Sequence, residues 1–301
     1  SSGFVGTNLL LKLIKDKNFK VYGSIFKTKP KIKSKKIKYI KANLLNSKDC
    51  LRATKNIDIV IMCAANSSGA KVMTSTPLVH LTPNLIMNTQ ILEAAYYNKV
   101  KKFIFISSNT VYPEGKKAMK ETDSRYEFFF KYHIVAWMKK FSEKMCEMYS
   151  LNIKDPMKTI VIRPGNLYGP YDKFDWEKSK VIAATIRKVV EKKNPIVVWG
   201  NGKDLKDFLY IEDFVDALIK IIKNKKIKNF DVFNIASGTS ITINKILDLL
   251  INLENLNGVK INHDTSMPSL IPIRKIDINK IRKIIKWKPK TKINSGLKKT
   301  I

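Results

Sequence analysis

Short apolar runs alternate along the chain with longer stretches in which apolar residues recur at helical spacing. The runs fall at residues 20–25, 57–63, 102–107 and 159–163, and each one predicts a strand. Such an alternation is typical of parallel strands that are joined by crossover helices. We therefore predict an α/β fold built on a doubly wound parallel sheet.

A glycine-rich turn opens the chain and is followed at once by a helical pattern. Gly3 and Gly6 are three residues apart, and the helix is expected to begin near Val5. Glycine allows the backbone to approach a pyrophosphate closely, and the first amides of a helix favour negative charge. The sequence therefore predicts a Rossmann-type dinucleotide site with contacts from Gly3, Phe4, Val5 and Gly6. A strand and a first glycine normally precede this turn, so we expect the central first strand to be truncated.

The chain divides into two parts in this interpretation. Residues 1–170 form the dinucleotide-binding Rossmann domain, which is N-terminally truncated. Residues 171–301 form a smaller C-terminal substrate-binding lobe, interleaved with returning sheet strands. A chain of 301 residues is long enough for one large domain and a smaller lobe of this kind.

The residues after the predicted strands indicate which dinucleotide binds. An NAD site usually has a carboxylate at the end of the second strand, where it binds the ribose hydroxyls. Here Lys27 follows the strand instead, and a lysine can pair with the 2′-phosphate of NADP, so NADP is favoured over NAD. The alternative is that Lys27 is one more surface lysine. Ala64 and Ala65 follow the next apolar run, and their small side chains allow a cofactor to lie close.

The composition changes this picture little. Lys and Arg number 57 against 25 Asp and Glu, a formal net charge of +32. Such an excess can indicate a nucleic-acid or acidic membrane partner, but here lysine is spread along the chain without an aromatic-interleaved basic stripe. We therefore expect no nucleic acid, no membrane and no metal among the partners. The cysteines Cys50, Cys63 and Cys146 are interpreted as reduced thiols of a cytoplasmic protein.

Several motifs occur in an order that is typical of one enzyme family. They are Ser107-Ser108-x-Thr110-Val111-Tyr112-Pro113, Arg163-Pro164-Gly165-Asn166-Leu167-Tyr168-Gly169-Pro170, Val198-Trp199-Gly200-x-Gly202, Asp207-Phe208-Leu209-Tyr210-Ile211-x-Asp213, Asn234-Ile235-Ala236-Ser237-Gly238 and Trp287-Lys288-Pro289. Together they resemble the extended short-chain dehydrogenases/reductases that act on nucleotide sugars, the NAD-dependent epimerase/dehydratase family, and most of all its GDP-L-fucose synthases. The resemblance covers nearly the whole chain and implies an NAD(P)-dependent enzyme of nucleotide-sugar metabolism.

The resemblance implies a serine, a tyrosine and a lysine that act together. Ser108 matches the serine that binds the reacting sugar oxygen, and Lys139 matches the lysine that holds the nicotinamide ribose. Val135 occupies the tyrosine position and can neither donate nor accept a proton, and loss of such a group typically costs ~10²–10⁴ in rate. Tyr132, one helical turn earlier, has two interpretations: it replaces the missing proton donor, or it is a buried aromatic residue.

Further positions are implied to contact the nucleotide sugar: Asn109, Asn166, Lys180, Trp199, Lys206 and Arg274. Lys206 stands where relatives usually carry arginine, and Arg274 is either a second diphosphate contact or a surface residue. Thr110 and Lys180 occupy the positions of the cysteine and histidine that move protons in GDP-L-fucose synthases, which argues against 3,5-epimerisation. A lysine acts as a base there only if desolvation lowers its pKa.

Two functions follow from these patterns. We expect a cytoplasmic, homodimeric, NAD(P)-dependent nucleotide-sugar epimerase, dehydratase or reductase that acts on a GDP-linked hexose. The alternative is a catalytically degenerate member that binds dinucleotide and nucleotide sugar without turnover. Val135, Thr110 and Lys180 together motivate the alternative.

Overall fold

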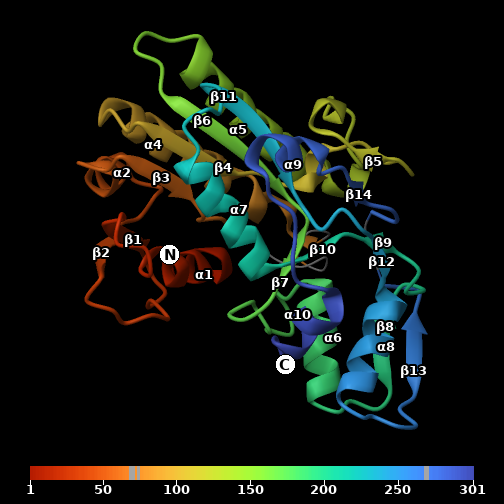
Figure 1. Ribbon diagram of the computed structural model, residues 1–301. Helices are drawn as coiled ribbons and strands as arrows, with labels where there is room; N and C mark the ends of the chain where they lie inside the picture. The colour runs from red at the N-terminus through yellow and green to blue at the C-terminus, as the bar shows by residue number, and fades with distance from the viewer. Residues whose placement is uncertain (68–71, 73–74, 268–270) are drawn as a thin grey trace.

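The computed structural model describes residues 1–67, 72, 75–267 and 271–301, and a parallel sheet lies at its centre (Figure 1). Four strands pair in the order β11-β6-β4-β3. They are β3 (Ile59–Met62), β4 (Lys102–Ile106), β6 (Lys158–Pro164) and β11 (Phe230–Ile235). β6 is buried at every position after its first residue, as expected of a central strand with both faces covered.

Helices cover both faces of this sheet. Alternate residues of β4 point to opposite faces, because Ile104 belongs to one hydrophobic core and Phe103 and Phe105 belong to another. The first core contains residues of α1 (Phe4–Leu13), α7 (Ile211–Lys223) and α9 (Asn279–Ile285), and the second contains residues of α2 (Ser47–Thr54), α4 (Thr82–Tyr97) and α5 (His133–Leu151). The predicted Rossmann-type, doubly wound α/β fold is confirmed.

The first predicted strand lies in a separate parallel pair. β1 (Val21–Ile25) pairs with β2 (Ile37–Lys41), and Figure 1 shows this pair beside α1. Leu10 of α1 packs in a small core with residues of both strands, whereas Leu9 of the same helix belongs to the core of the four-stranded sheet. α1 therefore joins the β1–β2 pair to the main sheet.

A second group of elements lies apart from the sheet (Figure 1). α6 (Val181–Val190) packs against α8 (Ile243–Leu253), next to the parallel pair of β8 (Ile196–Trp199) and β13 (Ile261–Asp264). Two short pairs connect this lobe with the sheet, β7 (Asn166–Tyr168) with β10 (Phe208–Tyr210) and β9 (Leu205–Lys206) with β12 (Ile241–Thr242). The chain then returns to the main sheet as β11, which pairs with β6.

Small elements complete the described chain. They are the pair β5 (Ala118–Met119) and β14 (Lys275–Ile276), helix α10 (Ile293–Lys298) and the 3-10 turns η1 (Pro77–His80), η2 (Asn109–Val111), η3 (Glu121–Asp123) and η4 (Phe130–Tyr132). No helix within the described ranges combines the length and the apolar character that a bilayer crossing requires.

A buried ion pair fixes α5 against the sheet. Glu143 of α5 receives hydrogen bonds from Arg163 of β6 at 2.9 and 2.6 Å, and both side chains are almost fully buried. Ser107, directly after β4, donates to the same carboxylate at 2.5 Å. The remaining Arg163 nitrogen donates to the Tyr112 hydroxyl and to the Glu121 carbonyl oxygen. Because every charge in this cluster is paired, its desolvation cost is offset by bidentate geometry.

Arg163→Met leaves the Glu143 carboxylate buried without its guanidinium. We expect the free energy of unfolding to fall by about 3–5 kcal/mol, as measured by urea denaturation followed by circular dichroism. Lys144→Met is the matched control, because it breaks an exposed pair with Glu147 on the same helix. A loss no larger than that of the control would contradict this prediction, and adding Glu143→Leu to Arg163→Met is expected to recover stability.

Candidate active site

A cavity of about 660 Å³ lies beyond the ends of β3, β4 and β6. One wall consists of the residues that follow these strands, together with α5, and the other consists of α6, β8 and residues of the second lobe. The carboxyl ends of parallel strands are where open α/β sheets bind their ligands, and the volume suits a small molecule.

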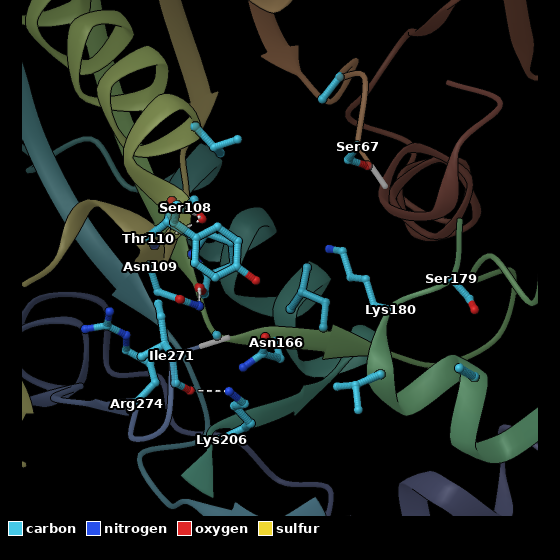
Figure 2. Close-up of a pocket in the computed structure, with 18 of the residues that line it drawn as sticks. Ser67, Ser108, Asn109, Thr110, Asn166, Ser179, Lys180, Lys206, Ile271 and Arg274 are labelled. Carbon is cyan, nitrogen blue, oxygen red and sulfur yellow. Dashed lines mark hydrogen bonds between the residues drawn. The ribbon is translucent and has the colours of Figure 1, made fainter. Parts of the chain in front are cut away.

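Most of the predicted site residues line this cavity: Val5, Ala64, Ala65, Ser108, Asn109, Tyr132, Lys139, Asn166, Lys180, Trp199, Lys206 and Arg274. Figure 2 shows Ser108, Asn109 and Thr110 on one side, Lys180 on the other, and Lys206 near Arg274. Gly3, Phe4, Gly6 and Lys27 are not among the lining residues. The structure thus brings the predicted catalytic and substrate-binding residues together, but only part of the predicted cofactor contacts.

Ser108 is positioned by the turn that ends β4. Its extended backbone precedes η2, and its hydroxyl oxygen accepts hydrogen bonds from the Thr110 amide at 3.2 Å and the Thr110 hydroxyl at 3.0 Å. Both bonds use the oxygen of Ser108 as acceptor, so its hydroxyl proton can be donated into the cavity. Asn109 points away to the Pro164 carbonyl, which it reaches at 3.0 Å. The turn therefore presents one hydroxyl donor to a bound ligand.

Lys139 is half-buried in the same wall. Its ammonium donates to the Ile106 carbonyl at 2.8 Å and lies 4.8 Å from the centre of the Phe105 ring. Burial lowers the pKa of Lys139 to about 8 against the attraction of the Glu143 carboxylate, and the charge of Lys180 acts in the same direction as burial. A lysine with this pKa holds a proton near neutral pH and can release it readily.

Tyr132 stands directly before α5. It is the last residue of η4 and the N-cap of α5, and it lines the cavity together with Val135 and Lys139. Burial raises its pKa well above the ordinary value, and the charges that act on it are those of Arg274 and Asp204. Its role as the proton donor stays a prediction.

The two predicted diphosphate contacts of the second lobe are cations held by backbone carbonyls. Arg274 is almost fully buried and donates to the carbonyl oxygens of Pro113 at 2.8 Å and Tyr112 at 3.3 Å, so its interpretation as a surface residue was wrong. Burial lowers its pKa to about 10, and its Nε is buried without a hydrogen-bond partner among the described residues. Lys206 is half-buried and donates to the Ile271 carbonyl (Figure 2), and it also pairs with Asp204 at 3.1 Å.

Three other predicted contacts come from elements that face the cavity. Lys180 is exposed and directly precedes α6. Trp199 ends β8 and is 37% exposed. Asn166 is tied down, because its side-chain amide donates to the Asp207 carbonyl at 3.0 Å.

Sequence reasoning missed Lys188, which also lines the cavity. Its ammonium donates to the Val197 carbonyl at 2.6 Å, and burial lowers its pKa. Helical spacing in the sequence could have indicated this residue. Val181, Thr185 and Lys188 lie on one face of α6, and all three line the cavity. Lys188 is thus a further cation of the cavity, in addition to the predicted Lys206 and Arg274.

The start of α1 fits the pyrophosphate of a dinucleotide. Gly3 caps the helix without a side-chain acceptor, so the first helical amides keep their donor capacity. A Cβ atom at Gly3 would meet nothing within 4 Å, which leaves open space in front of the helix, and Val5 beside it lines the cavity together with Ala64 and Ala65. Lys27 is exposed over the Phe26 ring, 5.6 Å from its centre.

This fold, with its cavity at the strand ends and a second lobe closing over it, is that of an extended short-chain dehydrogenase/reductase. The chain belongs to the NAD dependent epimerase/dehydratase family, whose sequence pattern matches residues 1–236. It is 32% identical over 249 residues to a GDP-L-fucose synthase of Sinorhizobium fredii (strain NBRC 101917 / NGR234), covering 80% of this chain and 77% of that protein. It is 31% identical over 250 residues to the probable GDP-L-fucose synthase 1 of Oryza sativa subsp. japonica, covering 80% and 74%.

Solved structures give the same fold. The UDP-glucose 4-epimerase of Thermotoga maritima, solved with UDP-glucose, superposes with a TM-score of 0.87. The match covers 99% of this chain and 94% of that one, at 23% sequence identity. At this identity the likeness is evidence for the fold alone.

The raised pKa of Tyr132 predicts that this phenol stays protonated over the working range of the protein. We expect the difference in tyrosinate absorbance between the unmodified protein and Tyr132→Phe to be absent below about pH 10. Tyr97→Phe gives the reference signal of one solvent-accessible tyrosine, because the Tyr97 ring is 65% exposed. Tyrosinate from Tyr132 near neutral pH would contradict the prediction and would identify this residue as a base.

Proposed function

We propose that this chain is an NAD(P)-dependent oxidoreductase that acts on a GDP-linked hexose as an epimerase, a dehydratase or a reductase. One observation carries the proposal: a single cavity joins Ser108 and Lys139 at the strand ends to the half-buried Lys206 and the buried Arg274 of the second lobe. The first pair suits hydride and proton transfer at a sugar carbon, and the second suits a diphosphate. The GDP-sugar relatives support the choice of nucleotide.

The roles of the residues follow from their positions. The first amides of α1 bind the pyrophosphate of the dinucleotide, and NADP is preferred because no carboxylate follows β1. When bound, the nicotinamide supplies or accepts a hydride. Ser108 donates its hydroxyl proton to the reacting sugar oxygen, Lys139 holds the nicotinamide ribose, and Lys206 binds the diphosphate with help from Asn166, Trp199 and Arg274.

We further propose that the protein is a homodimer in the cytoplasm. Trp137, Phe141 and Met148 are exposed along α5 at helical spacing, so two copies of this helix could bury them against each other. Cys50 and Cys146 are buried free thiols, which suits a reducing compartment.

A second candidate function is binding without turnover. Val135 removes the usual proton donor, and Tyr132 lies under the influence of Arg274 and Asp204 and not of Lys139. In that case the dinucleotide and the nucleotide sugar would bind the same cavity, but no cofactor would be consumed.

Incubation with NADPH and a panel of GDP-linked 4-keto and 4-hydroxy hexoses separates the two functions. We expect consumption of nicotinamide absorbance and a product of changed mass or configuration, and a fall of about 10²–10³ in kcat for Ser108→Ala, because a donor to the reacting oxygen is lost. Ser179→Ala is the control, since this serine lines the opposite wall (Figure 2).

Binding of both ligands without turnover would instead favour the second function. The variant Val135→Tyr then shows whether turnover is absent because the enzyme has lost its proton donor or because the protein only binds its ligands. A gain of activity in this variant identifies a decayed enzyme, whereas no gain identifies a binding protein.

Lys206→Met is expected to weaken GDP binding by roughly tenfold or more, because a buried, charge-assisted contact to phosphate is lost. NADPH binding should stay within about twofold, since Lys206 lies on the wall of the second lobe. Calorimetric titration with each nucleotide measures both effects. Lys203→Met is the matched control, because Lys203 is exposed and does not line the cavity. Equal losses of GDP affinity in the two variants would refute the proposed diphosphate site.

A further inference from the structure

One face of α5 carries Val135, Lys139 and Glu143 at successive intervals of four residues. Val135 and Lys139 both line the cavity. The valine side chain is short and apolar, and Glu143 is not among the lining residues, so Lys139 is the titratable group that these three positions contribute to the cavity.

The ammonium of Lys139 lies close to the strand end that presents Ser108. It donates to the carbonyl of Ile106, two residues before Ser108, and this is its one hydrogen bond among the described residues. An ammonium has three N–H donors, so others remain for a ligand. Ser108 and Lys139 therefore line one cavity, Ser108 from the turn after β4 and Lys139 from α5.

Among the described residues, no carboxylate forms an ion pair with Lys139, although the charge of Glu143 favours its ammonium form. Glu143, one turn further along α5, is engaged by both Arg163 and Ser107. The other groups that face the ammonium are the Cys146 thiol of the same helix, the Phe105 ring of β4 and the positive Lys180 before α6. This surrounding makes the proton of Lys139 unusually easy to release, in agreement with the lowered pKa.

We propose that Lys139 itself transfers the proton that accompanies hydride transfer, in the place of the tyrosine hydroxyl that Val135 excludes. This inference rests on the proposed function. In the reductive direction, Lys139 gives one ammonium proton to the carbonyl oxygen of the sugar while the carbonyl carbon receives a hydride from the reduced nicotinamide. The π electron pair of the carbonyl forms the new O–H bond, Ser108 holds the oxygen, and Lys139 is left as a neutral amine.

The direction of the pH dependence follows. Reduction needs the ammonium form, so its rate is expected to fall as pH rises through about 8. Oxidation needs the neutral amine, so its rate is expected to rise through the same range. Tyr132 cannot produce this dependence, because burial raises its pKa.

Competitive labelling with acetic anhydride tests the titration without any cofactor. We expect the acetylation rate of Lys139, followed by peptide mass spectrometry in the ligand-free protein, to level off above a midpoint near pH 8. Lys144 on the same helix is the internal control, because its hydrogen bond to Glu147 raises its pKa. A Lys139 midpoint no lower than that of Lys144 would overturn the inference.

Lys139→Ala tests the chemical role directly. Single-turnover hydride transfer is expected to fall by ~10²–10⁴. Methylamine in the buffer should restore part of the rate, and more so at a pH where its ammonium form is present for reduction. A residue that merely positions the ribose would not be rescued in this way. Tyr132→Phe is the matched variant and is expected to keep the pH midpoint of the unmodified protein.

The outcomes distinguish the inference from the function on which it rests. If the unmodified protein turns over no sugar, the proposed function fails and this inference fails with it. If it turns over a sugar but Lys139→Ala is not rescued, or if the pH midpoint disappears in Tyr132→Phe, only the role of Lys139 is refuted.

Discussion

The ion pair between Glu143 and Arg163 is the contact on which the geometry of the cavity depends. It connects the middle of α5 to β6, and Ser107 extends the same cluster to the end of β4. These are the elements that present Lys139 and Ser108. Glu143 is engaged by this guanidinium, and its charge favours the ammonium form of Lys139 against the larger effect of burial, which lowers the pKa of that lysine. A contact that stabilises the fold thus also bears on the acid–base character of the site.

Cations around the cavity differ in how firmly they are held. Arg274 and Lys206 are hydrogen-bonded to backbone carbonyls, and they come from segments about seventy residues apart in the sequence. Their positions are therefore set before any ligand arrives, and little side-chain entropy is lost when an anion binds. Lys180 is exposed and must be ordered by its ligand. We therefore expect Arg274 and Lys206 to contribute more to the affinity for an anion than Lys180 does, although each carries one positive charge.

The sequence predicted the layers of the fold well, because β4 and β6 are buried runs whose pattern is local. It also predicted which residues meet at the strand ends, since motifs in a known order fix that edge of the sheet. It could not predict that a short 3-10 turn ends at Tyr132, because helical spacing alone does not distinguish this turn from the start of α5. The burial of Arg274 was equally out of reach, since its partners lie about 160 residues earlier. Local patterns carry no information on such distant contacts.

The path of the chain between its two lobes limits how such a protein can change during evolution. After β7 the chain enters the second lobe, returns through β10 and α7 to complete the main sheet with β11, and then leaves the sheet again for α8. The substrate-facing elements are therefore divided between a segment inserted between β6 and β11 and a segment that follows β11. A new specificity cannot be acquired by exchanging one terminal segment. It has to arise through replacements at individual positions such as Lys188 and Lys206, while both halves of the sheet keep their shared core.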